Sequence, residues 1–199
     1  MAKLDITTQT RGIDAFLETL DKPLHRRIIE NYRRHAIFEI TGYKEKIFTP
    51  DMTVENPVYL FNGPVACLRL EGTEEILGYY SSLQQREATV MVIQDEKLAV
   101  ADWGFASEAV FNSFMPGSCV PTWMTADPEK LYIYRQTTAM IWPYDERGRL
   151  IGEHVYRHSD GAELIEVGAD EFITLEEARE KLTPLQRELS PLDLQPAGG

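Results

Sequence analysis

The chain has 199 residues, 43% of them hydrophobic, and a formal net charge of −12. This length and hydrophobic content suit one domain with a substantial core. The acidic balance disfavours nucleic acids and anionic membranes as partners, because binding to them requires clustered cations. Arginines do gather over residues 26–34, but Glu30 lies among them, and the pattern is typical of a solvated helix face.

No run of 18 apolar residues is present, so we expect no membrane-spanning helix. The first residues lack the apolar stretch of a signal peptide, and the cysteines are limited to Cys67 and Cys119. Both observations favour a reducing, cytoplasmic location with two free thiols. A disulfide between these cysteines is the alternative.

The first part of the chain is expected to be helical. Residues 1–11 are polar and are expected to form a loosely attached arm, followed by a short helix over 13–20. Pro23 begins the longest helix candidate, 23–41, whose apolar side chains recur with helical spacing. We therefore separate an N-terminal arm and short helix, 1–22, from the main domain.

The main domain is expected to span residues 23–159 and to become rich in strands after the long helix. A helix over 73–86, capped by Thr73, interrupts this pattern. The predicted strands cover 52–61, 65–70, 88–94, 98–114, 131–143 and 149–157. Helices followed by a run of antiparallel strands predict an α+β fold, in which N-terminal helices wrap a curved antiparallel sheet into a cone with an internal hydrophobic pocket.

Two further segments have distinct compositions. Residues 115–129 hold three prolines and are long for a hairpin loop, which is typical of a lid or a partner contact. Residues 160–199 are expected to form a C-terminal extension, with a helix over 174–188 capped by Thr174 and a disordered end over the last ten residues.

Three short segments carry a resemblance to known proteins: Thr53-Val54-Glu55-Asn56-Pro57-Val58, Gly72-Thr73-Glu74-Glu75-Ile76-Leu77-Gly78-Tyr79-Tyr80 and Asp145-Glu146-Arg147-Gly148-Arg149-Leu150. They resemble a strand, the following helix and the last hairpin turn of ketosteroid isomerase, in the nuclear transport factor 2-like superfamily. That superfamily also includes dehydratases, epoxide hydrolases and polyketide cyclases. The resemblance spans roughly residues 25–157 and implies the cone fold described above.

The resemblance can be carried over residue by residue. The general base of ketosteroid isomerase falls on Asn56, which cannot accept a proton. Its tyrosine donor falls on Tyr32, and its second donor, a protonated aspartate, falls on Thr137. Because only the tyrosine is retained, we expect the pocket to persist with a chemistry other than steroid isomerisation.

Alternation along the strands extends this alignment to neighbouring positions. If Thr137 faces the pocket, Arg135 faces it too, and Glu153 is expected to face inward on the last strand. The opposite face of strand 131–143 would then be an aromatic outer surface, which suits a homo-oligomer contact in a dimer or trimer. This face comprises Tyr132, Tyr134, Gln136, Met140 and Trp142.

Three residues are the candidate catalytic groups. Glu153 would be a general base, Arg135 would stabilise an oxyanion or a departing hydroxyl, and Tyr32 would be a phenol donor. A structural ion pair between Arg135 and Glu153 is the alternative. The candidate substrate-binding residues are Asn56, Val58, Tyr59, Trp103, Phe105, Thr137 and His35.

We expect neither a metal nor a cofactor, because the histidines show no metal-ligand spacing and no phosphate-binding loop is present. The predicted function is a cofactor-independent lyase that acts by acid–base chemistry on a hydrophobic aromatic small molecule. The resemblance extends to bacterial enzymes that release formaldehyde from lignin-derived diarylpropane diols to give a stilbene. The alternatives are an isomerase, dehydratase or polyketide cyclase of the same fold, and a non-catalytic binding or dimerisation module, which the loss of the base at Asn56 would favour.

Overall fold

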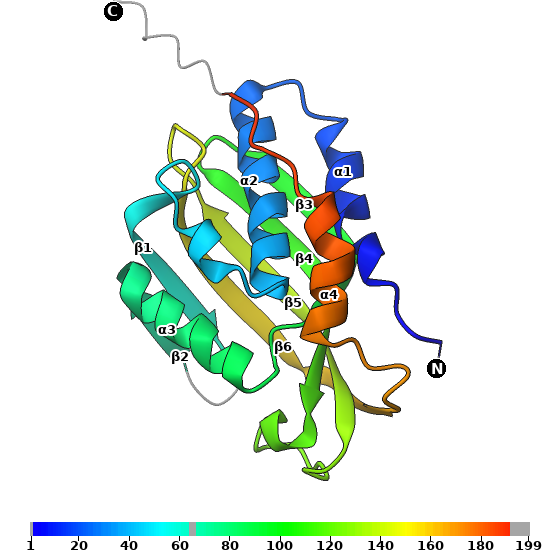
Figure 1. Cartoon of the computed structure of the whole chain (residues 1–199). Coiled ribbons are helices and arrows are strands. Elements are labelled where there is room, and N and C mark those ends of the chain that lie inside the picture. Colours follow the sequence, from blue (N-terminus) through cyan, green and yellow to red (C-terminus); the bar gives the residue numbers. More distant parts are fainter. Residues whose placement is uncertain (1, 64–66, 192–199) are drawn as a thin grey trace, which may run out of the picture.

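The computed structural model describes residues 2–63 and 67–191, with only the backbone at positions 159 and 160. One curved, six-stranded sheet, ordered β2-β1-β6-β5-β4-β3, forms the main layer (Figure 1). Its strands are β1 (Thr53–Asn62), β2 (Cys67–Glu71), β3 (Met91–Ala101), β4 (Gly104–Pro116), β5 (Leu131–Pro143) and β6 (Leu150–Val167). Helices cover it, so the predicted α+β cone is confirmed.

The helical segments in chain order are η1 (Ile6–Thr10), α1 (Arg11–Leu17), α2 (Pro23–Ile40), η2 (Lys44–Ile47), α3 (Gly72–Gln85), η3 (Gly117–Cys119), α4 (Leu175–Leu182) and η4 (Thr183–Leu185). Figure 1 shows α2 lying across the sheet, with α1 and α4 beside it and α3 next to β1 and β2. Proline at the first position of α2 starts the longest helix where the sequence predicts it. Tyr32 of α2 packs against Phe105 and Trp142 at ring distances of 4.6 and 5.2 Å, which anchors the helix to the sheet.

The N-terminal arm is not loosely attached, contrary to expectation. Ile6 is fully buried in η1. The Gln9 Oε1 atom accepts a hydrogen bond of 2.9 Å from the backbone N–H of Ile93, on the edge strand β3. The segment therefore covers a sheet edge that would otherwise expose unpaired backbone groups.

The predicted long strand over 98–114 is wrong, because a turn at Asp102 and Trp103 divides this region into β3 and β4. Gly104 follows the turn with a φ of +137°, and a Cβ there would lie 2.0 Å from the Trp142 carbonyl oxygen. Only glycine fits this approach of the hairpin to β5. A smaller correction is that Glu71, not Thr73, is the N-cap of α3. The described part of β2 begins at Cys67, and the predicted strand positions 65 and 66 lie outside the described chain.

The C-terminal extension continues the sheet before it turns back to the helices. β6 runs to Val167, ten residues past the predicted strand end at 157. Thr174 caps α4 as predicted, accepting a hydrogen bond of 3.2 Å from the Glu177 N–H, but α4 ends at Leu182 and Pro184 continues into η4. The disorder predicted for the last ten residues falls, from residue 192 onward, outside the described chain.

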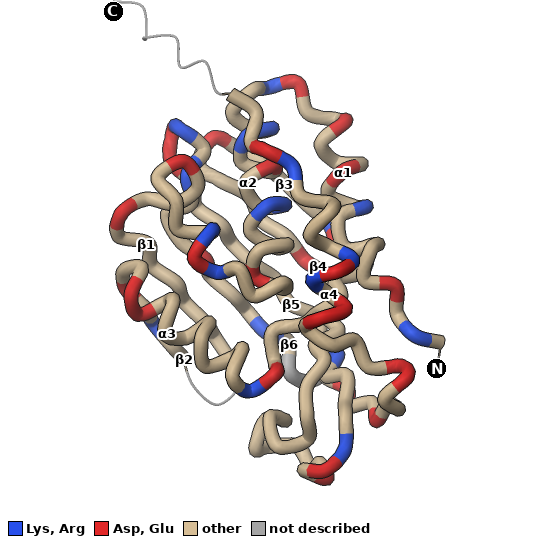
Figure 2. Tube along the Cα trace, viewed as in Figure 1, with Lys and Arg blue, Asp and Glu red and all other residues tan. Residues whose placement is uncertain are grey.

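The arginines of α2 hold this extension in place. Arg27, Arg33 and Arg34 donate hydrogen bonds of 2.7, 2.8 and 2.6 Å to the backbone carbonyls of residues 190, 185 and 187. Arg33 is only 3% exposed, so the predicted solvated helix face is wrong at this position. Figure 2 shows basic and acidic residues interspersed along the described chain in this view.

Two expectations from composition can be compared with the described residues. Cys67 and Cys119 are free thiols, as predicted. Among the described helices, none combines the length and apolar character needed to cross a membrane.

Replacing Gly152 by alanine tests the parallel β1–β6 pairing. An added Cβ would lie 2.1 Å from the Val58 carbonyl oxygen, so one strand would have to shift. We expect Gly152→Ala to lower the free energy of unfolding by about 2–3 kcal/mol, measured by urea denaturation, because backbone atoms have little room to relax. Gly78→Ala is the control, since nothing lies within 4 Å of a Cβ there and alanine favours a helix. Wild-type stability in Gly152→Ala would contradict this pairing.

Candidate functional site

A cavity of about 450 Å³ lies between the helices and the sheet, as the cone fold predicts. Its floor is buried: Trp142 is 2% exposed and Glu153 6%. Trp123, in the loop after η3, is 42% exposed and marks the mouth, together with Cys119 and Arg86. The proline-rich loop that the sequence singled out therefore contributes to the wall of the cavity.

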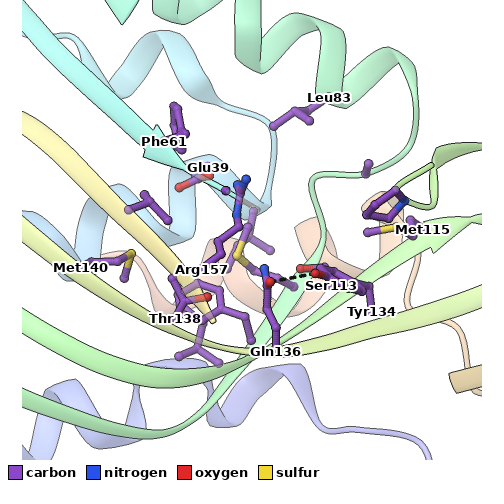
Figure 3. Close-up of a pocket in the computed structure, with 18 of the residues that line it drawn as sticks. Glu39, Phe61, Leu83, Ser113, Met115, Tyr134, Gln136, Thr138, Met140 and Arg157 are labelled. Carbon is purple, nitrogen blue, oxygen red and sulfur yellow. Dashed lines mark hydrogen bonds between the residues drawn. The ribbon is translucent and has the colours of Figure 1, made fainter. Parts of the chain in front are cut away.

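The cavity wall on β5 is the face that was predicted to point outward. Tyr134, Gln136, Thr138 and Met140 line the cavity (Figure 3). Trp142 of the same strand belongs to the lining as well. The Tyr134 hydroxyl donates a hydrogen bond of 2.9 Å to Gln136 Oε1. The predicted aromatic outer surface is therefore wrong. Because side chains alternate along a strand, a displacement of one residue in the alignment reverses every position.

Arg135 and Thr137 consequently lie on the side of β5 away from the cavity. The Arg135 Nε–H donates a hydrogen bond of 2.8 Å to Asn112 Oδ1, and its guanidinium lies 3.5 Å from the Glu163 carboxylate. Asn112 is itself fully buried and donates to the Val92 carbonyl. The expectation that Arg135 faces the pocket as a catalytic group is therefore wrong, and it pairs with Asn112 and Glu163 rather than with Glu153, the partner in the alternative prediction.

None of the seven predicted binding residues is part of the cavity lining, and three of them are also exposed or only half-buried. Asn56 is exposed, because the pairing of β1 with β6 shifts register between Thr53 and Val58 and the alternation is broken there. Val58 is half-buried opposite Gly152. Trp103 is 51% exposed, since it lies in the β3–β4 turn rather than within a strand.

Three others are buried directly behind the lining. The Phe105 ring stacks on Trp142 at 5.6 Å and also touches Tyr32. His35 packs edge-on against Trp142 at 5.0 Å, and its Nε2 atom is 3.2 Å from the Tyr80 hydroxyl. Tyr59 is fully buried next to Tyr80. These residues support the cavity wall.

Glu153 faces the cavity, as the sequence predicts. Burial raises the pKa of its carboxyl well above the usual value, and Glu39 raises it further, whereas Arg157 acts in the opposite direction. Its Oε2 atom has no hydrogen-bond partner among the described residues. The protonated form of the carboxyl is therefore favoured, and its Oε2 atom is buried without a partner from the described part of the chain.

Tyr32 also lines the cavity, and its hydroxyl donates a hydrogen bond of 2.5 Å to Glu96 Oε1. Burial raises the pKa of the Glu96 carboxyl from 4.5 to about 7, although the Tyr32 hydrogen bond lowers it. Burial, followed by the Glu96 charge, raises the pKa of Tyr32 well above its usual value. At neutral pH the phenol is therefore neutral, and the carboxyl titrates.

Three polar residues of the site escaped the sequence prediction. Glu39 lies seven residues after Tyr32, on the same face of α2, and Arg157 shares the strand parity of Glu153. Both point into the cavity in Figure 3, and their spacing could have revealed them. Glu96 could not be found in this way, because a β-bulge turns it inward.

The residues that line the cavity also carry buried polar groups without a hydrogen-bond partner among the described residues. The Thr138 hydroxyl and the Trp142 indole N–H are buried and have no hydrogen-bond partner among the described residues. Because leaving such groups unpaired costs free energy, they favour a ligand with oxygen atoms on an aromatic or apolar frame. Within the described residues, no group of three histidine, cysteine or acidic side chains is placed to hold a metal ion.

Structural comparison supports the cone fold. The chain matches a nuclear transport factor 2-like protein from Anabaena variabilis with a TM-score of 0.50 and 14% identity, over 71% of this chain and 95% of that one. It matches a candidate polyketide cyclase from Xanthomonas campestris pv. campestris with a TM-score of 0.50 and 11% identity, over 69% and 94% of the two chains. The chain has the nuclear transport factor 2-like fold. No protein-family model and no curated protein sequence matches it.

The titration of Glu96 predicts a pH dependence of stability. Its folded-state pKa of about 7 exceeds the ordinary 4.5. Its contribution to the free energy of unfolding is therefore fully present below about pH 4.5 and is lost as the pH rises through 7. The difference corresponds to about 3 kcal/mol at most. We expect the free energy of unfolding, measured by urea denaturation, to fall less in Glu96→Gln than in the wild type between pH 4.5 and 7. Parallel curves for the two proteins would contradict the assigned pKa.

Proposed function

We propose that this chain is a cofactor-independent enzyme that acts by acid–base chemistry on an aromatic small molecule bound in the cavity. The supporting observation is the Glu153 carboxyl on the buried floor, whose pKa is raised well above the usual value and whose Oε2 atom has no hydrogen-bond partner among the described residues. A carboxyl that keeps its proton at neutral pH is suited to general acid catalysis. The cavity volume of about 450 Å³ is within the range of sites for ligands with two aromatic rings.

Our narrower proposal is a lyase that releases formaldehyde from a phenolic diarylpropane diol, the class suggested by the resemblance stated above. The substrate is bound as its phenolate. Glu153 donates its proton to the benzylic hydroxyl, which departs as water, and the phenolate oxygen becomes the carbonyl of a quinone methide. The neighbouring CH₂–OH then loses its hydroxyl proton, and its electrons form the C=O bond of formaldehyde. The C–C bond breaks toward the quinone methide, which regains its aromatic ring, so that the products are a stilbene, water and formaldehyde.

The wall of the cavity suits such a substrate. Trp142, Tyr134 and Phe111 present aromatic or apolar surface, and the unpaired Trp142 N–H and Thr138 hydroxyl supply hydrogen bonds to ring oxygens. The Arg157 guanidinium lies 5.7 Å from the centre of the Phe61 ring. Arg157 is exposed, so it lies on the solvent side of the cavity. A cation there favours a phenol or phenolate group at the outer end of the ligand.

Glu153→Gln tests the acid role. The substitution keeps the shape of the side chain but removes the proton that it donates, so we expect kcat to fall about 10²–10⁴-fold. Turnover would be followed by stilbene absorbance and formaldehyde release from a phenolic diarylpropane diol. Glu163→Gln is the matched control, because Glu163 is a carboxylate paired with Arg135 on the other side of the sheet. We expect it to retain wild-type turnover.

Two results would count against this proposal. Unchanged kcat in a folded Glu153→Gln variant would remove Glu153 from the chemistry. Tight binding of the diol by the wild type without any product, measured by calorimetry and chromatography, would favour the non-catalytic binding module. Conversion to a dehydrated or rearranged product without formaldehyde would instead favour a dehydratase or isomerase.

A further inference from the structure

A β-bulge places Glu96 against the cavity wall. Gln94 pairs with Val110 and Lys97 with Glu108, so Asp95 and Glu96 together oppose the single residue between those two on β4. Asp95 has a φ of +53°, a conformation that costs free energy in any residue other than glycine. Without the bulge, alternation from Ile93 on the cavity side would turn Glu96 to the opposite side.

The bulge brings this carboxyl to the one polar atom of Tyr32. A phenol has a single proton, and Tyr32 donates it to Glu96 over 2.5 Å. The phenol oxygen can then only accept a hydrogen bond from a group in the cavity. Tyr32 therefore presents an acceptor to the ligand, whereas the sequence predicted a donor.

Glu96 and Glu153 are both carboxyls whose pKa burial raises, but their neighbours differ. Beside Glu153, the Glu39 charge raises the pKa further and favours the protonated form. Burial raises the pKa of Glu96 to about 7, which makes it a group that can both take up and release a proton at neutral pH. A carboxyl in which burial favours the protonated form and a second one that titrates near neutral pH suit the roles of acid and base.

We propose that Tyr32 and Glu96 together form the base of the reaction, with Tyr32 accepting the ligand's hydroxyl proton while it passes its own proton to Glu96. This inference rests on the proposed function. Glu96 does not touch the ligand and acts as a positioning residue for Tyr32. In the lyase reaction, the CH₂–OH proton moves to the Tyr32 oxygen and the phenol proton moves to Glu96. Glu153 supplies the proton of the departing water, and exchange with solvent restores both carboxyls.

The charged and titratable groups around this pair come from several elements. Glu153 on β6 and Tyr144 after β5 both act on Tyr32 and raise its pKa, after burial and Glu96. On β3, Lys97 is exposed and pairs with Glu108 of β4. On α2, His25 lies two turns before Tyr32 and pairs with Asp102 of the β3–β4 turn.

The pair can be tested without any ligand. The protein would carry ¹³Cζ-labelled tyrosine, with the Tyr32 signal assigned from Tyr32→Phe. We expect this signal to shift with a midpoint near pH 7 in the wild type and to lose that transition in Glu96→Gln. Asp95→Asn is the control, because asparagine tolerates a positive φ and the Asp95 carboxylate, next to Glu96 in the sequence, is exposed. The Asp95→Asn variant should retain the transition. A transition that persists in Glu96→Gln, or none in the wild type, would overturn the inference.

Turnover then tests whether the pair acts in the reaction. We expect kcat/KM of the wild type to fall below about pH 7 as Glu96 takes up a proton, and this limb to be absent in Glu96→Gln, with kcat reduced about 10–100-fold at pH 8. Tyr32→Phe combined with Glu96→Gln should be no slower than Tyr32→Phe alone, because the two act as one unit. Additive losses would overturn the inference.

The two proposals fail in different ways. Loss of turnover in Glu153→Gln together with a wild-type pH profile in Glu96→Gln overturns the base assignment and leaves the enzyme. A Glu96-dependent tyrosine transition in a protein whose turnover does not depend on Glu153 supports the coupled pair and removes the proposed acid.

Discussion

Ionising a carboxyl inside an apolar cavity costs several kcal/mol unless a cation and hydrogen-bond donors are close to it. Glu153 is in this situation, because Arg157 offsets only part of the effect of burial and of Glu39. The protonated form of Glu153 is therefore favoured. Glu96, at the partly buried edge strand and supported by the Tyr32 hydroxyl, is the carboxyl that can ionise. The separation of roles in the cavity follows from this difference in burial.

The broad fold could be predicted because it depends on strong periodic signals. α2 begins at its proline, and its apolar residues face the sheet over the whole predicted length. β5 covers the predicted stretch 131–143, in which buried and less buried side chains alternate regularly. The Thr174 hydroxyl caps α4 by accepting a backbone hydrogen bond. The turn at Asp102 and Trp103 was missed, since neither residue demands a turn and the glycine that permits it follows them.

The site was harder to predict, since it depends on single-residue offsets. On β5 the alternation was predicted correctly, but the two faces were assigned the wrong way round. Gln136 and Thr138 face the cavity, whereas Arg135 and Thr137 lie on the other side of the strand. On β6 the phase was right, and Glu153 faces the cavity. No periodicity can place Glu96, because the bulge that turns it inward is a local departure from alternation.

The arginines of α2 have a consequence for how the molecule assembles. Their hydrogen bonds join residues separated by more than 150 positions, from Arg33 to the carbonyl of residue 185 and from Arg27 to that of residue 190. During synthesis, α2 leaves the ribosome long before these partners exist, and contacts so distant in sequence form slowly. The helix that carries Tyr32 and Glu39 therefore stays uncovered on its outer side until the end of β6 and the segment after it have been made.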